Sequence, residues 1–313
     1  MKLLIAYDGS SCSEAALDDL TRAGLPDDAE ALVLTIGEIW LPSPADEPIG
    51  EYADHLENDW LLNKNGKNGS RTCSEVKILA KHAHKRLQVH FPNWKVEIQT
   101  DCGSPAQEII NQSNRIRADL IVVGSHGRGG RFILGSVSNK VVSEAVCSVR
   151  VARGRIEVDP IPSRVVIGYD GSHGANAAVD AVIARKWREG SEFRLITVAD
   201  QVAPSAIERF VPPIAHWVEN EIRAEHEWIK KIIAPALEKL RAAGLAATAD
   251  ICAGNPKQIL IEEAARWHSD CIFVGANRFG SRLKKFLLGS VSAAIAARAA
   301  CSVEVVRKND VKS

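Results

Sequence analysis

An internal repeat constrains this chain more than any other feature. Leu-Leu-Ile-Ala-Tyr-Asp-Gly-Ser at residues 3–10 returns as Val-Val-Ile-Gly-Tyr-Asp-Gly-Ser at 165–172, an offset of 162 residues. Leu-Gly-Ser-Val-Ser at 134–138 returns at 288–292, and Cys-Ser-Val at 147 returns at 301, both with an offset of 154 residues. Segments that repeat at the start and at the end predict two copies of one fold in tandem. The length of 313 residues agrees, because single domains cluster around roughly 100–150 residues.

The two copies differ in length between their shared segments. The offset falls from 162 to 154 residues, so the first copy carries the larger insertion. We place it in residues 41–72, whose Pro, Asn, Gly and Ser content disfavours regular structure and predicts a surface loop. Gly154, Pro160 and Pro162 separate the copies. The predicted organisation is a first domain over 1–153, a linker over 154–163 and a second domain over 164–308.

Hydrophobic runs alternate with helical segments in each copy. In the first copy the runs predict five strands, at 3–7, 31–36, 95–100, 120–123 and 148–152. Ser11 with Glu14 forms a capping-box pattern for a helix to about residue 23, and Ser104 before Pro105 marks another helix start. Nearly continuous hydrophobic strands between helices predict a parallel sheet covered on both faces. The predicted class is α/β: two tandem doubly wound domains, each a five-stranded mainly parallel sheet with helices on both faces.

Composition excludes several classes of protein. Acidic and basic residues balance at 39 each, and no dense Lys/Arg block is present, so neither nucleic acid nor a membrane surface is an expected partner. The seven cysteines form no Cys-x-x-Cys pair, which predicts small buried thiols in a reducing compartment and no metal site. No hydrophobic signal core and no apolar run of the ~18–20 residues that span a membrane is found. We expect a cytoplasmic protein.

A stripe of large apolar residues recurs at helical spacing in the second copy. Such a stripe faces the core more often than it faces a partner, so we predict a core role and keep partner binding as the alternative. The stripe comprises Trp217, Ile222, Trp228, Ile229, Ile232 and Ile233.

Ligands of an open parallel sheet bind at the carboxyl ends of its strands. Asp8 and Asp170 stand there, at the end of the first strand of each copy and directly before a Gly-Ser turn. Either carboxylate could accept hydrogen bonds from a ribose hydroxyl or a base amine. The alternative, which is more common for an isolated Asp, is capping of the following helix.

A glycine-rich turn follows the fourth strand and reads Gly124-Ser125-His126-Gly127-Arg128-Gly129-Gly130. Glycines allow backbone N–H groups to converge on an anion. Gly135-Ser136-Val137-Ser138 then opens a helix to about residue 146, whose free N–H groups, dipole and hydroxyls also favour an anion. With Asp8 nearby, the combination predicts a nucleotide site. A Walker ATPase and a Rossmann dehydrogenase lose support, because neither glycine motif occurs at its required place.

These residues resemble the nucleotide signature of the universal stress protein family, and the resemblance covers essentially both halves. The signature is G-x2-G-x9-G-[ST] after strand four, with an Asp at the end of strand one; here only seven residues separate Gly127 from Gly135. The resemblance implies an adenine nucleotide alpha hydrolase-like fold and ATP or AMP as ligand, with Mg²⁺ as a candidate companion of ATP. By resemblance the first site comprises Asp8, Ile36 through its backbone, Gly124, Ser125, His126, Gly127, Gly135, Ser136, Val137 and Ser138.

The second copy departs from the signature in another way. Its turn reads Gly275-Ala276-Asn277-Arg278-Phe279-Gly280, so Arg278 replaces the second glycine. An arginine there could pair with a phosphate or fill the pocket, which leaves binding in this copy open. By resemblance the second site would comprise Asp170, Val198, Gly275, Gly289, Ser290, Val291 and Ser292.

The leading functional hypothesis is an adenine-nucleotide-binding stress-response protein that acts as a sensor or adaptor. We predict little or no hydrolysis and no catalytic residue, because His126 is the nearest general-base candidate and such a His more often packs. Two alternatives are an interaction scaffold with degenerate sites and a weak ATPase or autophosphorylating protein. By resemblance, residues 148–152 and 302–306 pair antiparallel and form an intramolecular pseudo-dimer; a protein partner and a further homodimer are left open.

Overall fold

The computed structural model describes residues 1–37, 73–128, 131–153, 161–199, 212–276 and 288–307. Of residues 73–74, 126–128, 131–133 and 212–226, only the backbone is described. The expected loop over 41–72, most of the linker, and Arg278 therefore lie outside the described residues. None of the described helices is long and apolar enough to cross a bilayer.

One ten-stranded sheet runs through both copies, in the order β10-β9-β8-β11-β12-β7-β4-β1-β2-β3. Each half contributes five strands, as predicted, and all pairs within a half are parallel. The first half supplies β1 (Lys2–Ala6), β2 (Glu30–Gly37), β3 (Lys95–Cys102), β4 (Leu120–Gly124) and β7 (Ser148–Ala152). The second half supplies β8 (Arg164–Gly168), β9 (Glu192–Ala199), β10 (Ala246–Ala253), β11 (Cys271–Gly275) and β12 (Ser302–Val306).

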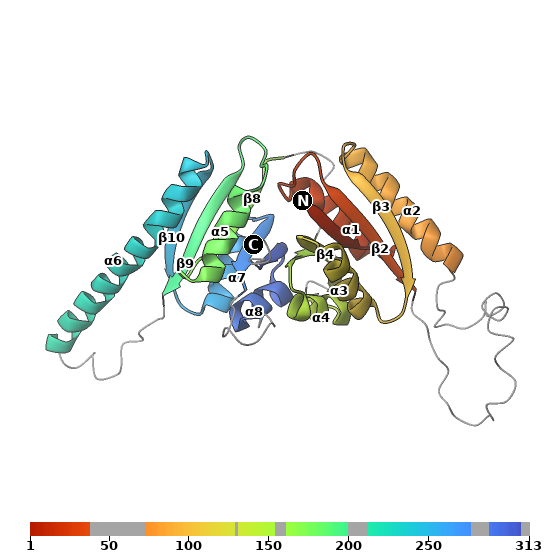
Figure 1. The fold of residues 1–313 in the computed structure, drawn as a ribbon. Coiled ribbons are helices and arrows are strands. Elements are labelled where there is room, and N and C mark those ends of the chain that lie inside the picture. Colours follow the sequence, from red (N-terminus) through yellow and green to blue (C-terminus); the bar gives the residue numbers. More distant parts are fainter. Residues whose placement is uncertain (38–72, 129–130, 154–160, 200–211, 277–287, 308–313) are drawn as a thin grey trace, which may run out of the picture.

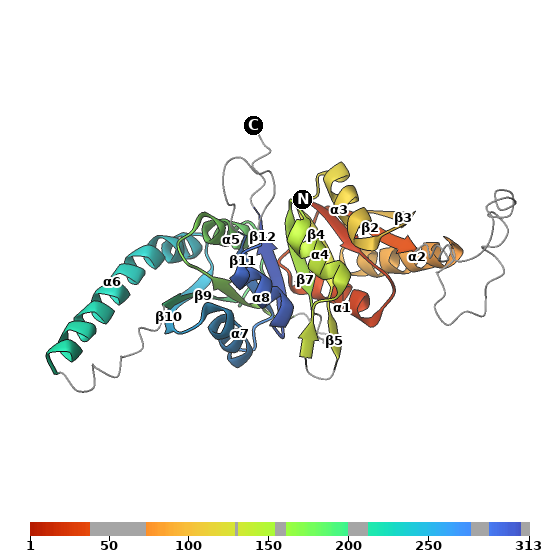
Figure 2. The same cartoon turned by 90° about the horizontal axis from the view of Figure 1, so that it is seen from below.

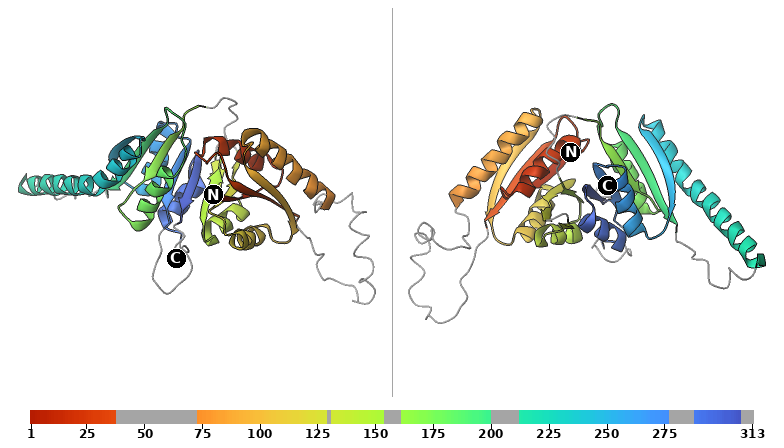
Figure 3. Two further views of the ribbon diagram at one scale, coloured as in Figure 1. Left: turned by 45° about the horizontal axis from the view of Figure 1, so that its top comes forward. Right: turned by 180° about the vertical axis from the view of Figure 1, so that it is seen from behind.

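Helices cover both faces of this sheet, which confirms the doubly wound class (Figure 1). On one face, α3 (Pro105–Ile116), α4 (Ser136–Glu144), α7 (Pro256–Arg266) and α8 (Ser290–Arg298) pack on a single core shared by both halves. On the other face, α1 (Ser11–Asp19) with α2 (Cys73–His90), and α5 (His173–Ile183) with α6 (Pro212–Ala242), cover two separate cores. Helices α2 and α6 therefore lie on the outer flanks, while α4 and α8 lie side by side at the centre (Figures 1 and 3).

The two halves meet where β7 pairs with β12. This pair is antiparallel, and Glu304 lies opposite Arg150 in its register. The predicted antiparallel pairing of 148–152 with 302–306 is thus confirmed, and it makes the two halves an intramolecular pseudo-dimer. Because β7 and β12 pair with each other, neither presents a free edge at the centre of the molecule.

Two local predictions were wrong. The N-cap of α1 is Ser10, whose hydroxyl accepts a hydrogen bond from the Ser13 N–H at 3.2 Å. Because the cap lies one residue earlier than predicted, Ser13 and not Glu14 stands at the capping-box position, and Ser11 and Glu14 form no capping box. The Glu14 carboxylate accepts hydrogen bonds from the Tyr7 hydroxyl and the Arg86 guanidinium.

The apolar stripe of α6 faces the core only in part. Ile229 and Ile233 are buried at 5% and 4% exposure, whereas Trp228 is 63% exposed and its core prediction was wrong. Neighbouring positions of a helix lie about 100° apart, so burial of Ile229 turns Trp228 towards solvent. The side chains of Trp217 and Ile222 lie outside the described residues.

Candidate functional site

The order of the strands defines one crevice in each half. From β1 the chain runs outward to β2 and β3, and it returns to place β4 on the opposite side of β1. The sheet thus reverses its winding between β1 and β4, and correspondingly between β8 and β11. Ligands of doubly wound folds bind outside the carboxyl ends of the strands at such a point. The predicted site residues follow these strand ends.

Asp8 and Asp170 occupy equivalent exposed turns directly after the first strands. One carboxylate oxygen of each accepts a hydrogen bond at 2.9 Å, from the Ser10 N–H and the Ser172 N–H respectively. Gly9 lies between Asp8 and Ser10 with φ of +71°, a conformation that glycine adopts without strain. The helices themselves are capped by Ser10 and Ser172, so the capping role considered for Asp8 and Asp170 is not the one they play. Each carboxylate instead forms a local turn with the backbone N–H of the N-cap serine, which holds it at the strand end.

The helices that follow the glycine turns begin without a side-chain cap. Gly135 and Gly289 are the N-cap residues of α4 and α8, and no side chain caps the N–H groups of either helix among the described residues. The first backbone N–H groups of both helices therefore need partners from outside the helix. An anion is the ligand that such a helix end favours.

The two serines at each helix start differ in burial and in hydrogen bonding. Ser138 is buried and donates to the carbonyl oxygen of Gly124 at 2.7 Å, and Ser292 donates to that of Gly275 at 2.8 Å. These hydroxyls fix the helix start to the strand end, although we expected them to face an anion. Ser136 and Ser290 are exposed, while Val137 and Val291 pack against the core and offer only backbone groups.

Gly124 and Gly275 are required by packing as well as by any ligand. A Cβ atom on Gly124 would lie 2.7 Å from the carbonyl oxygen of Cys12, in the first turn of α1. A Cβ on Gly275 would lie 2.0 Å from the carbonyl carbon of Gly174, at the start of α5. Both glycines therefore let a helix approach the strand end, a role that the sequence analysis did not foresee.

The first glycine-rich turn folds as a small hairpin. Strand β5 (His126–Arg128) pairs antiparallel with β6 (Arg131–Ile133), and Gly127 lies opposite Phe132. The hairpin extends from the end of β4, and β6 contacts α8 of the other half (Figure 2). The extended pairing of Gly127 differs from the compact anion nest that the glycine content indicated. Just before the hairpin, the buried Ser125 hydroxyl has no hydrogen-bond partner among the described residues.

The remaining predicted site residues lie near the carboxyl ends of the strands in their own half. Ile36 is half-buried near the end of β2, and Val198 holds the corresponding place near the end of β9. His126 contributes a described backbone position on β5 but no described side chain. In the second half, Asp170, Gly275 and the start of α8 lie near the ends of β8 and β11, as their counterparts lie near the ends of β1 and β4.

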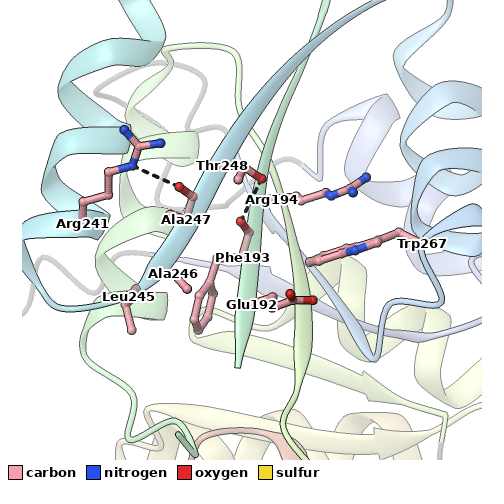
Figure 4. Close-up of a pocket in the computed structure, with 9 residues that line it drawn as sticks. All are labelled: Glu192, Phe193, Arg194, Arg241, Leu245, Ala246, Ala247, Thr248 and Trp267. Atoms are coloured by element: carbon pink, nitrogen blue, oxygen red, sulfur yellow. Dashed lines mark hydrogen bonds between the residues drawn. The ribbon is translucent and has the colours of Figure 1, made fainter. Parts of the chain in front are cut away.

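A cavity of about 400 Å³ lies elsewhere (Figure 4). Its lining includes Glu192 and Ala246, the first residues of β9 and β10, so it lies at the amino ends of these strands. The Arg194 guanidinium sits over the Trp267 ring at 4.5 Å from its centroid. This cavity lies at the end of the strands opposite the predicted nucleotide crevice of the second half and does not belong to that crevice.

Ionisable groups near the first crevice are engaged in structural contacts. Burial, together with the hydrogen bond to Glu14, raises the pKa of the Tyr7 phenol well above its usual value, so this phenol stays protonated at neutral pH. The Arg86 guanidinium pairs with Glu14 and Asp18 and ties α2 to α1. Among the described residues, no group of three or more His, Cys, Asp or Glu side chains could hold a metal ion.

Two buried arginines that contact the helices of the candidate sites, Arg153 and Arg307, were not predicted from the sequence. Each donates hydrogen bonds to carbonyl oxygens at the end of α8 or α4, in the half to which it does not belong. A signal was present, because the repeat extends beyond Cys-Ser-Val: Cys-Ser-Val-Arg-Val-Ala-Arg at 147–153 returns as Cys-Ser-Val-Glu-Val-Val-Arg at 301–307.

Comparison with known proteins matches this architecture over the whole chain. A family model described as the universal stress protein family matches residues 1–153 and 162–307. A universal stress protein of Mycobacterium tuberculosis is 27% identical over 318 residues, which cover 98% of this chain and 97% of that protein. The universal stress protein YxiE of Bacillus subtilis is 30% identical over 154 residues, which cover 49% of this chain and 98% of YxiE.

A solved structure shows the same fold at full length. The crystal structure of a universal stress protein from Archaeoglobus fulgidus has a TM-score of 0.65 and 20% identity, and the match covers 98% of each chain. The repeat, the two doubly wound halves and the family match agree with one another. The chain belongs to the universal stress protein family and carries the family domain twice in tandem.

Proposed function

We propose that the chain binds an adenine nucleotide, ATP or AMP, in the crevice between β1 and β4 and in its counterpart between β8 and β11. The observation that carries the proposal is the uncapped glycine N-terminus of α4 and of α8 beside the winding reversal of the sheet. Free N–H groups at a helix start bind phosphate well, because several donors and the helix dipole act on the same anion.

The other strand ends would hold the nucleoside. The Asp8 carboxylate, kept at the mouth of the first crevice by its hydrogen bond from Ser10, can accept from ribose hydroxyls. The backbone at Ile36 lies on the adjacent strand, where the resemblance to the family places the adenine. The buried Ser125 hydroxyl needs a partner, and a ligand oxygen in the crevice would supply one. Mg²⁺ would accompany ATP through the phosphates.

A sensor or adaptor role with little hydrolysis fits the described residues better than an enzymatic one. General-base catalysis needs a basic side chain within hydrogen-bond reach of the attacking group and held in place by a second group. At the ends of β1 and β8, the Asp8 and Asp170 carboxylates each already accept a backbone hydrogen bond. We propose a cytoplasmic location and domain limits of 1–153 and 164–308.

Titration calorimetry on the full-length chain tests the proposal. Wild type should bind ATP or AMP with a stoichiometry near two, and GTP under the same conditions controls for the base. Asp8→Ala and Asp170→Ala are matched variants at equivalent positions. Each should weaken one site by roughly 10-fold or more, because a hydrogen bond to a charged group contributes about 1.5–3 kcal/mol. If no nucleotide binds at millimolar concentration and none is released from freshly purified protein, the interaction scaffold is favoured instead. One structural observation already points that way, because Gly127 is engaged in the pairing with Phe132.

A further inference from the structure

Two arginines cross between the halves and end on the helices of the proposed nucleotide sites. Arg307, directly after β12, donates to the carbonyl oxygens of Val142 and, at 3.3 Å, Cys147 in the first half. Arg153, directly after β7, donates to the carbonyl oxygens of Ala296 and, at 3.1 Å, Cys301 in the second half. Both arginines are buried, at 4% and 8% exposure.

The contacts of the two arginines are related by the sequence repeat. Arg307 lies 154 residues after Arg153, and the acceptors Ala296 and Cys301 lie 154 residues after the acceptors Val142 and Cys147. Two serines with the same offset hold the arginine backbones: the Arg307 N–H donates to the Ser148 hydroxyl at 3.0 Å, and the Arg153 N–H donates to the Ser302 hydroxyl at 2.8 Å. The contacts therefore form one reciprocal arrangement about the β7–β12 pair.

Each arginine donates hydrogen bonds to carbonyl groups at the C-terminal end of a short helix. After α4 the chain leaves the helix at Ala145 with ψ of 148°, and after α8 it does so at Ala299 with ψ of 145°. The last carbonyls of both helices then require donors from outside the helix. A cation at this end also interacts favourably with the helix dipole. Arg307 and Arg153 supply both the donors and the charge.

The opposite ends of α4 and α8 are the uncapped starts that face the crevices. Each helix has 9 residues and is therefore about 13 Å long, so a shift of its last turn displaces its first turn. The two helices also lie side by side at the centre of the molecule (Figure 1). A contact at the far end of each helix can thus determine where its phosphate-facing N–H groups point.

We propose that Arg307 is a positioning residue for the nucleotide site of the first half, and that Arg153 plays the same part for the second. Each site then depends on an arginine supplied by the other half of the chain. This inference rests on the proposed function for its ligand, but the support that each arginine gives to a helix can be measured without one.

Hydrogen exchange on the full-length chain without ligand is the first experiment. Arg307→Met should accelerate amide exchange in α4 by 5-fold or more and leave α8 close to wild type, while Arg153→Met should do the reverse. Arg307→Lys keeps the charge with fewer donors and should fall between Arg307→Met and wild type, which also provides a milder variant should the Met variant fold poorly. Equal acceleration of α4 and α8 by each variant, or no acceleration, would overturn the proposal.

Calorimetry in two backgrounds is the second experiment, because Asp170→Ala leaves the first site to titrate and Asp8→Ala leaves the second. Arg307→Met should weaken ATP or AMP binding at least 5-fold in the Asp170→Ala background, and less than 2-fold in the Asp8→Ala background. If wild type binds and Arg307→Met affects neither site, this inference alone fails. If wild type binds no nucleotide, the proposed function fails and the positioning role fails with it.

Discussion

Replacement of Arg150 by Met should destabilise the folded chain by about 3–5 kcal/mol, the range observed when one partner of a buried ion pair is removed. The Arg150 side chain is fully buried at the centre of the β7–β12 pair. Its Nε atom lies 2.6 Å from the Asp19 carboxylate, and its Nη1 atom lies 3.3 Å from the Glu304 carboxylate. Glu304 keeps a second partner, because Arg185 also donates to it. Asp19 would keep only the described hydrogen bond from Ser302.

Most of the lost stability should therefore come from the unpaired Asp19 carboxylate, and a double-mutant cycle can isolate this contribution. Free energies of unfolding from urea titration should show that Asp19→Asn with Arg150→Met costs at least about 2 kcal/mol less than the sum of the single variants, since the uncompensated charge is gone. Lys186→Ala is the control: its pair with Asp27 is 65% exposed on both sides and should contribute within about 1 kcal/mol. An Arg150→Met loss no larger than that of the control, or strictly additive effects, would refute the reasoning.

Three further outcomes are expected. Gly275→Ala should lower the free energy of unfolding by more than about 2 kcal/mol, because its Cβ would lie 2.0 Å from backbone at the start of α5. Ile229→Ala should cost about 2–5 kcal/mol and the adjacent Trp228→Ala less than about 0.5 kcal/mol, in urea titrations that compare a buried with an exposed side chain. Burial raises the pKa of the Cys147 thiol to about 11, so the folded chain holds a proton that the unfolded chain releases from about pH 9. Wild type should therefore lose up to about 2–3 kcal/mol more stability than Cys147→Ala between pH 9 and pH 11, and equal slopes would contradict this.

The repeat and the hydrophobic runs were sufficient to predict the fold, because both are local patterns that the strands preserve. All five strands of the first half were predicted to within two residues. The antiparallel pair at the centre, which the structure confirms, was implied by the resemblance to the family and not by these patterns. The errors occurred where contacts with other parts of the chain determine the local structure. The Glu14 carboxylate, for example, forms no capping box and accepts hydrogen bonds from Tyr7 and Arg86.

The positions of the candidate site residues in the fold could be predicted more successfully than the contacts that these residues make. Asp8, Gly124 and Gly135 do follow neighbouring strand ends of one crevice. Their composition could not show that the Ser138 hydroxyl bonds to Gly124, or that Gly127 would enter an extended pair with Phe132. These outcomes depend on the approach of α1 and α4 to the sheet, which no short motif encodes.

The two repeats keep their symmetry at some buried charges and break it at others. Both copies have an arginine at the equivalent positions 153 and 307, and each side chain bonds to carbonyl groups at the end of the equivalent helix in the opposite half. At the centre of the strand pair, Arg150 of the first copy faces Glu304 of the second. Two first copies paired in this register would place Arg150 opposite a second Arg150, and like charges directly opposite each other destabilise a strand pair. Glu304, at the position equivalent to Arg150, therefore favours pairing between the two unlike copies. Arg153 and Arg307 make equivalent contacts in both directions.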